Sequence, residues 1–134
     1  MFVNPCGSWR GRAAFVVAMF VSASASAAAQ INLFYDYGNP AGCENLKSGA
    51  YDDDSMFSLT REGFSSYVTS CEFLQALRPK NDSYVVTVIC GHEGDEALTL
   101  EMYRIQKAAD GADAYEIYTK DGDLWQWVEP CLGD

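Results

Sequence analysis

Four cysteines in the last two thirds of the chain constrain its fold most. Cys43, Cys71, Cys90 and Cys131 are separated by 28, 19 and 41 residues. A zinc site of four cysteines usually brings its ligands in close pairs such as C-x2-C, so we expect no metal. The fifth cysteine, Cys6, precedes the apolar run of residues 13–21 and is expected to leave with a signal peptide. The even number that remains indicates two disulfides in a short exported domain. Of the three pairings that four cysteines allow, we favour Cys43 with Cys71 and Cys90 with Cys131, although the sequence alone leaves all three open.

The first 29 residues have the order of a secretory signal peptide. Two arginines and no acidic residue precede the apolar run AAFVVAMFV of residues 13–21, and SASASAAA follows it. A positive start, an apolar segment of about 7 to 15 residues and an Ala-x-Ala site define such a peptide. We predict cleavage after Ala29, with Ala27 and Ala25 as alternatives, and a periplasmic or secreted protein. The apolar run is far shorter than the roughly 20 residues that span a bilayer, so no transmembrane segment is expected.

The predicted mature chain is strongly acidic. Without residues 1–29 it keeps all 19 acidic residues and 7 of the 9 basic ones, so its net charge is 7 − 19 = −12. Nucleic acid and anionic membranes both require a basic surface, so neither is an expected partner. A cationic partner would be attracted, although acidic side chains also keep an exported domain soluble and monomeric. We therefore expect a monomer.

The pattern after the signal peptide predicts one all-β domain. Residues 30–42 are expected to form an N-terminal arm or loop, and residues 43–134 a single β domain. Six segments combine β-branched and aromatic residues with alternating polarity: SMFSLTRE, FSSYVTSCEFLQAL, SYVVTVICG, EALTLEMYRI, AYEIYTK and DLWQWVEP. Their spacing predicts a small antiparallel meander of about six strands, either a barrel or a sandwich, held by two disulfides.

Three of these segments need comment. Residues 64–76 fit helical spacing as well as strand alternation; we favour strand, and a helix there would make the fold α+β. In EALTLEMYRI the apolar Leu98, Leu100 and Met102 share one face and the polar side chains the other, as in a strand with one solvent-exposed side. Asp-Gly within residues 120–123 predicts a hairpin with a type I′ turn.

The stretch CGHEGDE, residues 90–96, contains the only histidine, His92. A zincin requires H-E-x-x-H, but position 96 is Glu and no second histidine exists. Cys90 is expected in a disulfide, so it offers no thiolate nucleophile. Gly91 and Gly94 favour a loop between two strands. We therefore interpret the stretch as a turn with a solvent-exposed His92 and expect no catalytic residue and no cofactor.

Two further groups of residues are candidates for binding. Asp52, Asp53 and Asp54 lack the spacing of a calcium loop and are interpreted as a solvated turn. Trp125 and Trp127 are two residues apart in a strand pattern, so they are expected to share a face. Tyr118 and Tyr103 are expected to join them from neighbouring strands. The four aromatics form either a core layer or an exposed platform for a sugar or peptide, and core is the default.

The segments SMFSLTREGFSSYVTSC, VICGHEG and LWQWVEPC, together with Cys43, resemble small exported four-cysteine β domains of Gram-negative bacteria. The resemblance covers about residues 43–131 and implies the compartment and the fold. It implies no activity. We therefore expect a non-enzymatic binding or interaction module for a basic envelope protein or a glycan. The alternatives are a cell-wall hydrolase that uses carboxylates or His92, and a purely structural envelope protein.

Overall fold

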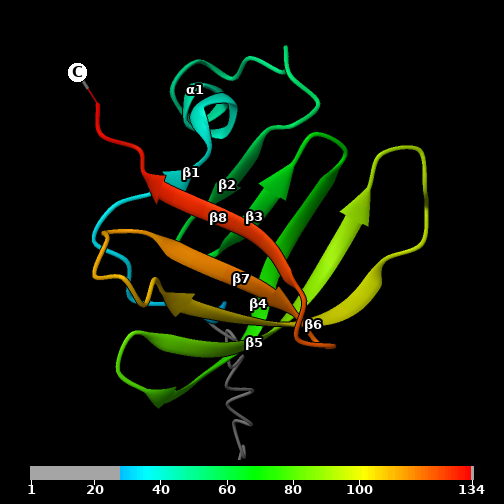
Figure 1. The fold of residues 1–134 in the computed structure, drawn as a ribbon. Coiled ribbons are helices and arrows are strands. Elements are labelled where there is room, and N and C mark those ends of the chain that lie inside the picture. The colour runs from blue at the N-terminus through cyan, green and yellow to red at the C-terminus, as the bar shows by residue number, and fades with distance from the viewer. Residues whose placement is uncertain (1–27, 134) are drawn as a thin grey trace, which may run out of the picture.

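The computed structural model describes residues 28–133, which fold as a closed antiparallel barrel of eight strands with one helix (Figure 1). The elements, in chain order, are β1 (Tyr37–Gly38), α1 (Pro40–Ser48), β2 (Phe57–Leu59), β3 (Gly63–Ser66), β4 (Thr69–Lys80), β5 (Ser83–His92), β6 (Thr99–Lys107), β7 (Tyr115–Thr119) and β8 (Leu124–Pro130). Each strand pairs with the next, and β1 pairs with β8 to close the barrel. The predicted all-β meander is confirmed as a barrel. Residues 1–27 of the predicted signal peptide lie outside the described residues.

The strand count differs from the predicted six for two reasons. The two-residue β1 carries no periodic pattern that a sequence could show. Residues 64–76, which fitted two periods at once, contain the end of β3, a turn at Tyr67 and Val68, and much of β4. A register shift between Phe73 and Gln75 disturbs the alternation again. The segment is therefore strand rather than helix, and its mixed pattern records a turn and a bulge.

Large apolar side chains fill the interior of the barrel. Along β5, Tyr84, Val86, Val88 and Cys90 alternate with more exposed neighbours and point inward. The other inward side chains that are buried include Phe57, Leu59, Phe64, Phe73, Ile105, Ile117 and Val128. An interior packed in this way is typical of eight-stranded barrels, whose width just accommodates the side chains.

The predicted arm is more ordered than a loop. Ile31 and Leu33 belong to the buried core, whereas Phe34 is exposed. Helix α1 begins inside the arm, where the Asn39 side chain accepts a hydrogen bond from the backbone N–H of Gly42 (2.8 Å). The helix ends at Ser48 and is capped by Gly49, whose φ is 74°. Asn at the N-cap, Pro at the next position and Gly after the last turn are the usual signals of a short helix, and the expectation of an arm or loop over residues 30–42 was wrong for residues 40–42.

Two disulfides are present, but not in the favoured pairing. Cys71 is bonded to Cys90 and Cys43 to Cys131. Cys71 and Cys90 lie directly opposite each other in the β4–β5 hairpin. Closure of the barrel brings the end of β8 beside α1, and so joins cysteines 88 residues apart. The number of disulfides is confirmed, the favoured partners are wrong, and the bonds fit an oxidising compartment.

The β7–β8 hairpin is confirmed, but its turn is not type I′. Gly122 has a φ of 91°, whereas Asp121 is not among the residues with positive φ. The backbone N–H of Gly122 donates to the carbonyl of Thr119, and that of Thr119 donates to the carbonyl of Asp123. This is the pattern of a type I turn followed by a glycine bulge, which needs positive φ at one residue only.

Candidate functional site

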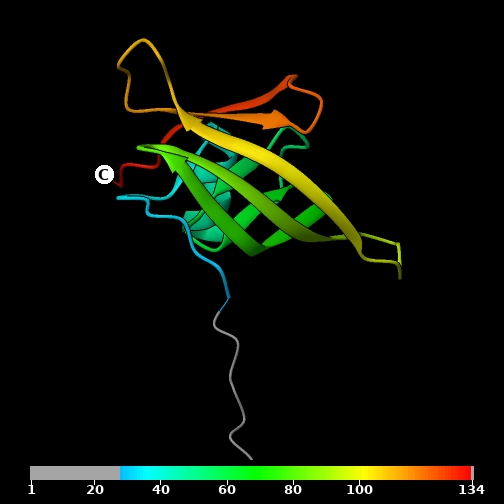
Figure 2. The ribbon, with the colours of Figure 1, turned by 90° about the horizontal axis from the view of Figure 1, so that it is seen from below.

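One end of the barrel gathers most of the acidic loop residues. Because neighbouring strands are antiparallel, loop 49–56, turn 67–68, loop 93–98 and turn 120–123 all lie at the same end, which we call the acidic end. In Figure 2 the β5–β6 loop and the β7–β8 turn both lie on the right, opposite the β6–β7 loop. The loops of the acidic end contain eight carboxylates: Asp52, Asp53, Asp54, Glu93, Asp95, Glu96, Asp121 and Asp123.

A single basic residue accompanies these carboxylates in the loops. It is Lys120, whose Nζ lies 2.8 Å from Asp121, so the loop charge is 1 − 8 = −7. Two other ion pairs, Arg78 with Asp82 and Lys107 with Asp113, lie at the opposite end. The negative potential is therefore concentrated where the barrel opens, and it is largely uncompensated there.

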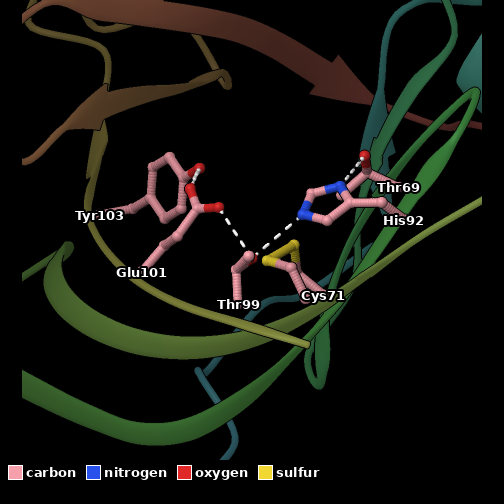
Figure 3. The surroundings of a disulfide bond; sticks show 7 residues. Thr69, Cys71, His92, Thr99, Glu101 and Tyr103 are labelled. Atoms are coloured by element: carbon pink, nitrogen blue, oxygen red, sulfur yellow. Dashed lines mark hydrogen bonds between the residues drawn. A yellow bond between two sulfur atoms is a disulfide. The ribbon is translucent and has the colours of Figure 1, made fainter. Parts of the chain in front are cut away.

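Inside the acidic end, five side chains form a continuous chain of hydrogen bonds (Figure 3). His92, the last residue of β5, bonds to Thr69 through Nδ1 (2.8 Å) and to Thr99 through Nε2 (3.0 Å). Thr99 donates to one oxygen of Glu101 (3.1 Å), and the Tyr103 hydroxyl donates to the other. We call these five residues the mouth chain. Its members come from β4, β5 and β6, and alternation turns all of them toward the interior.

The carboxylate of Glu101 sets the direction of the chain. Since Thr99 donates its proton to Glu101, its oxygen accepts the proton on Nε2 of His92, and in the neutral imidazole Nδ1 then accepts from Thr69. Burial, reinforced by the hydrogen bond to Glu101, raises the pKa of Tyr103 well above the usual 10. Tyr103 therefore acts as a stable donor and not as a base.

Glu101 has no ion-pair partner among residues 28–133. Its two described donors are neutral hydroxyls. A half-buried carboxylate in a low-dielectric setting attracts cations more strongly than one in water. The mouth chain can thus bind a cationic group at Glu101, or polarise the Thr69 hydroxyl through His92.

The four predicted ligand-binding aromatics do not form one surface. Trp125 stacks on Tyr103 with ring centroids 5.1 Å apart and also contacts Phe57 and Phe64, so these two aromatics belong to the acidic end. Trp127 is 43% exposed and lies opposite Glu116, to which the Tyr118 hydroxyl donates. Trp127 and Tyr118 are therefore on the outer surface.

A bulge separates the two tryptophans. Ile117 pairs with Gln126 and the next residue, Tyr118, pairs with Leu124, so Trp125 has no partner in β7. The extra residue reverses the alternation, and Trp125 turns inward while Trp127 stays outside. The prediction of a shared face was wrong because a sequence pattern does not show where a strand bulges.

Strand β6 has the opposite orientation to the one that its pattern suggests. Thr99, Glu101 and Tyr103 face the interior, whereas Leu100 and Met102 are 69% and 50% exposed. A groove of about 520 Å³ runs beside this part of the strand. We call it the β6 groove; it is lined by Thr87, Leu100, Glu101, Met102, Tyr103, Thr119, Lys120 and Asp121.

Both predicted turns, in residues 90–96 and at Asp52, Asp53 and Asp54, are present. The stretch around Glu93 and Gly94 is a turn, and Gly94 has a φ of 80°. His92 is not the predicted exposed turn residue, since its ring is half-buried and both nitrogens are hydrogen-bonded. The predicted turn at the Asp cluster is confirmed. There the backbone N–H of Ser55 donates to Asp53 (2.8 Å), and hydrogen bonding from the side chain and then the backbone of Ser55 lowers the pKa of Asp53.

Thr69, Thr99 and Glu101 were not predicted as site residues from the sequence. No local motif links these residues to His92, because they meet only when β4, β5 and β6 are paired. The alternation of Thr99, Glu101 and Tyr103 was visible, but it was interpreted as a solvent-exposed face.

Comparison with known proteins finds no matching family model, no matching curated protein and no matching solved structure. The resemblance to exported four-cysteine domains thus stays a prediction. Among residues 28–133, no helix is long and apolar enough to cross a bilayer. The same residues contain no group of three or more His, Cys, Asp or Glu side chains arranged to hold a metal ion.

Proposed function

We propose that this protein is an exported, non-enzymatic interaction module that binds a basic protein partner at its acidic end. The observation that carries the proposal is the charge of that end, where eight loop carboxylates face one lysine that is already ion-paired. Fields of this kind steer oppositely charged proteins and raise their association rates. The two disulfides support a domain that works in an oxidising compartment.

Glu101 and the aromatic pair beneath it add a place for contact. A charged rim alone raises the association rate and orients the partner, whereas affinity requires desolvated contacts near the centre of an interface. The half-buried Glu101 and the stacked Tyr103 and Trp125 supply such groups. A lysine or arginine of the partner can therefore reach a carboxylate that has no counter-ion among the described residues.

Binding of defined basic proteins, with lysozyme as the first probe, tests this proposal. The oxidised domain would be titrated by calorimetry at about 0.05 M and about 0.5 M salt, since screening shortens the range of surface charges to a few Å at the higher concentration. We expect saturable binding that weakens steeply with salt.

A matched pair of variants locates the binding surface. Glu96→Gln with Asp123→Asn removes two charges from the acidic end, and neither carboxylate makes a described hydrogen bond. Asp110→Asn with Glu129→Gln removes two charges from the opposite end of the barrel. The first pair should weaken binding and the second should not. Equal effects, or no saturable binding to any basic protein, would refute the proposal.

A second candidate function is hydrolysis. The hydrogen bond between the Thr69 hydroxyl and His92, extended through Thr99 to Glu101, has the order of a nucleophile, a base and an orienting group. A groove of about 610 Å³ lies beside Thr69 and His92. If this alternative holds, Thr69→Ala and His92→Ala each abolish turnover of a cell-wall substrate. Unchanged turnover in both variants would exclude it.

A further inference from the structure

The N-terminal half of β6 has an open edge. Tyr103 is the first residue of β6 that pairs with β7, through Thr119. From Thr99 to Met102 the strand pairs only with β5 on its other side. The β6 groove runs along this open edge, between the strand and the β7–β8 turn. An open edge with exposed apolar side chains can receive another extended chain.

The backbone groups that face the open edge can be assigned. The N–H of Lys107 donates to Asp82 on the β5 side, whereas the N–H of Ala108 donates to Ala114 on the β7 side. Successive residues of a strand direct their groups to opposite neighbours, so odd-numbered residues of β6 bond toward β5. Leu100 therefore directs its N–H and C=O toward the open edge, and Met102 directs its N–H there. The C=O of Met102 faces the N–H of Lys120, because the pairing of Tyr103 with Thr119 depends on a bond between these two groups.

The side chains around the edge define what a paired segment would require. Leu100 and Met102 cover the outer face, so a neighbouring strand needs apolar residues there. Glu101 lies between them on the inner face and has no described counter-ion. The backbone N–H and C=O of Glu101 bond toward β5. A residue opposite Glu101 in an added antiparallel strand would therefore form a non-hydrogen-bonded pair with it, in which the Cα atoms are about 4.5 Å apart.

Two further features of the groove favour a basic residue at that position. Lys120 and Asp121 both line the groove and offset each other's charge, since the Nζ of Lys120 lies 2.8 Å from Asp121, so the excess negative charge comes from the other carboxylates of the acidic end. The Oγ1 atom of Thr119 is buried without a hydrogen-bond partner among residues 28–133, and Thr119 also lines the groove. An ammonium or guanidinium group that reaches Glu101 can also donate to this oxygen.

We propose that the β6 groove binds an extended segment of the basic partner by strand addition, with an apolar–basic–apolar sequence whose basic residue lies opposite Glu101. This inference rests on the proposed function and names the element that the partner presents. Main-chain hydrogen bonds to Leu100 and Met102 give affinity, and Glu101 gives specificity. A second copy of this chain is a poor occupant, because each copy without residues 1–29 has a net charge of 7 − 19 = −12.

The test uses the full oxidised domain and the blocked peptide Thr-Val-Lys-Val-Thr, with a Glu-for-Lys peptide as the control. Two-dimensional amide NMR should show the largest shifts at Leu100 and Met102 with the lysine peptide and none with the control.

Met102→Pro removes one edge donor that the fold does not use, and proline is tolerated at strand edges. It should weaken peptide binding about fivefold, whereas Met102→Ala keeps the donor. Glu101→Gln should weaken binding about tenfold or more, and Glu129→Gln should not.

The outcomes separate this inference from the proposed function. One outcome refutes strand addition while the proposed function stands. In that outcome a basic protein binds in a salt-dependent way, Met102→Pro and Met102→Ala bind the peptide with equal affinity, and the Leu100 and Met102 amides do not shift. If neither a basic protein nor the peptide binds, both fail. Circular dichroism establishes that each variant is folded. The NMR shifts are measured on the unmodified domain, so that result does not depend on the folding of any variant. A domain that dimerises through β6, seen by sedimentation, would also overturn the inference.

Discussion

Loss of the Cys43–Cys131 disulfide should open the seam of the barrel. β1 and β8 are joined by two residue pairs, Tyr37 with Pro130 and Gly38 with Glu129, together with one hydrogen bond from the N–H of Cys131. The disulfide closes a loop with a sequence separation of 88 residues. Loop-closure entropy for that length corresponds to about 4.6 kcal/mol at 25 °C, against about 3.2 kcal/mol for the 19-residue separation of Cys71 and Cys90.

The assay is urea unfolding of Cys43→Ala with Cys131→Ala, measured beside the unmodified oxidised domain. Domains of this size are stable by about 5 to 15 kcal/mol, so a loss of about 4 to 5 kcal/mol leaves the variant marginally folded. Amide exchange should accelerate first at Tyr37 and Gly38, since these residues depend on the seam. In Cys71→Ala with Cys90→Ala the seam disulfide remains, and exchange at β1 should change less than exchange in β4 and β5.

A loss below about 1 kcal/mol would refute the reasoning, because it would mean that the two residue pairs of the seam hold the barrel closed without the long-range constraint. Faster exchange spread evenly over the barrel would also contradict it. That result would show that β1 and β8 open only with the whole domain.

Two further predictions follow from particular contacts. A Cβ at Gly42 would overlap the carbonyl of Phe57, so Gly42→Ala should lower the free energy of unfolding in urea by about 3 kcal/mol. Gly133→Ala, with no neighbour within 4 Å, should change it by less than about 0.5 kcal/mol. Burial raises the pKa of Tyr103 above the value of 10.0 for an unperturbed tyrosine. The unfolded chain therefore ionises first, and the stabilisation is complete below pH 10 and lost as the pH rises further. Tyr103→Phe should make stability less dependent on pH above 10, and an unchanged alkaline slope would contradict this.

Several features of the site were readable in the sequence, but their grouping was not. The acidic character, the strand at residues 99–107 and the turn near Gly94 all follow from composition, alternation and glycine placement. Alternation in β6 separates Leu100 from Glu101 correctly. It does not show which of the two faces the interior, because an apolar face has the same period whether it lies inside or outside the barrel.

The sequence by itself determines the β class, the two disulfides and the β7–β8 hairpin, since alternation, cysteine number and an Asp-Gly turn act over a few residues. Helix α1 was also readable from Asn39 and Gly49. Only the tertiary structure decides which cysteines pair, where Trp125 turns inward and how His92 meets Glu101. Those outcomes depend on strand register and barrel closure, which are fixed by contacts between residues far apart in the chain, and a bulge of one residue reverses every face that follows it.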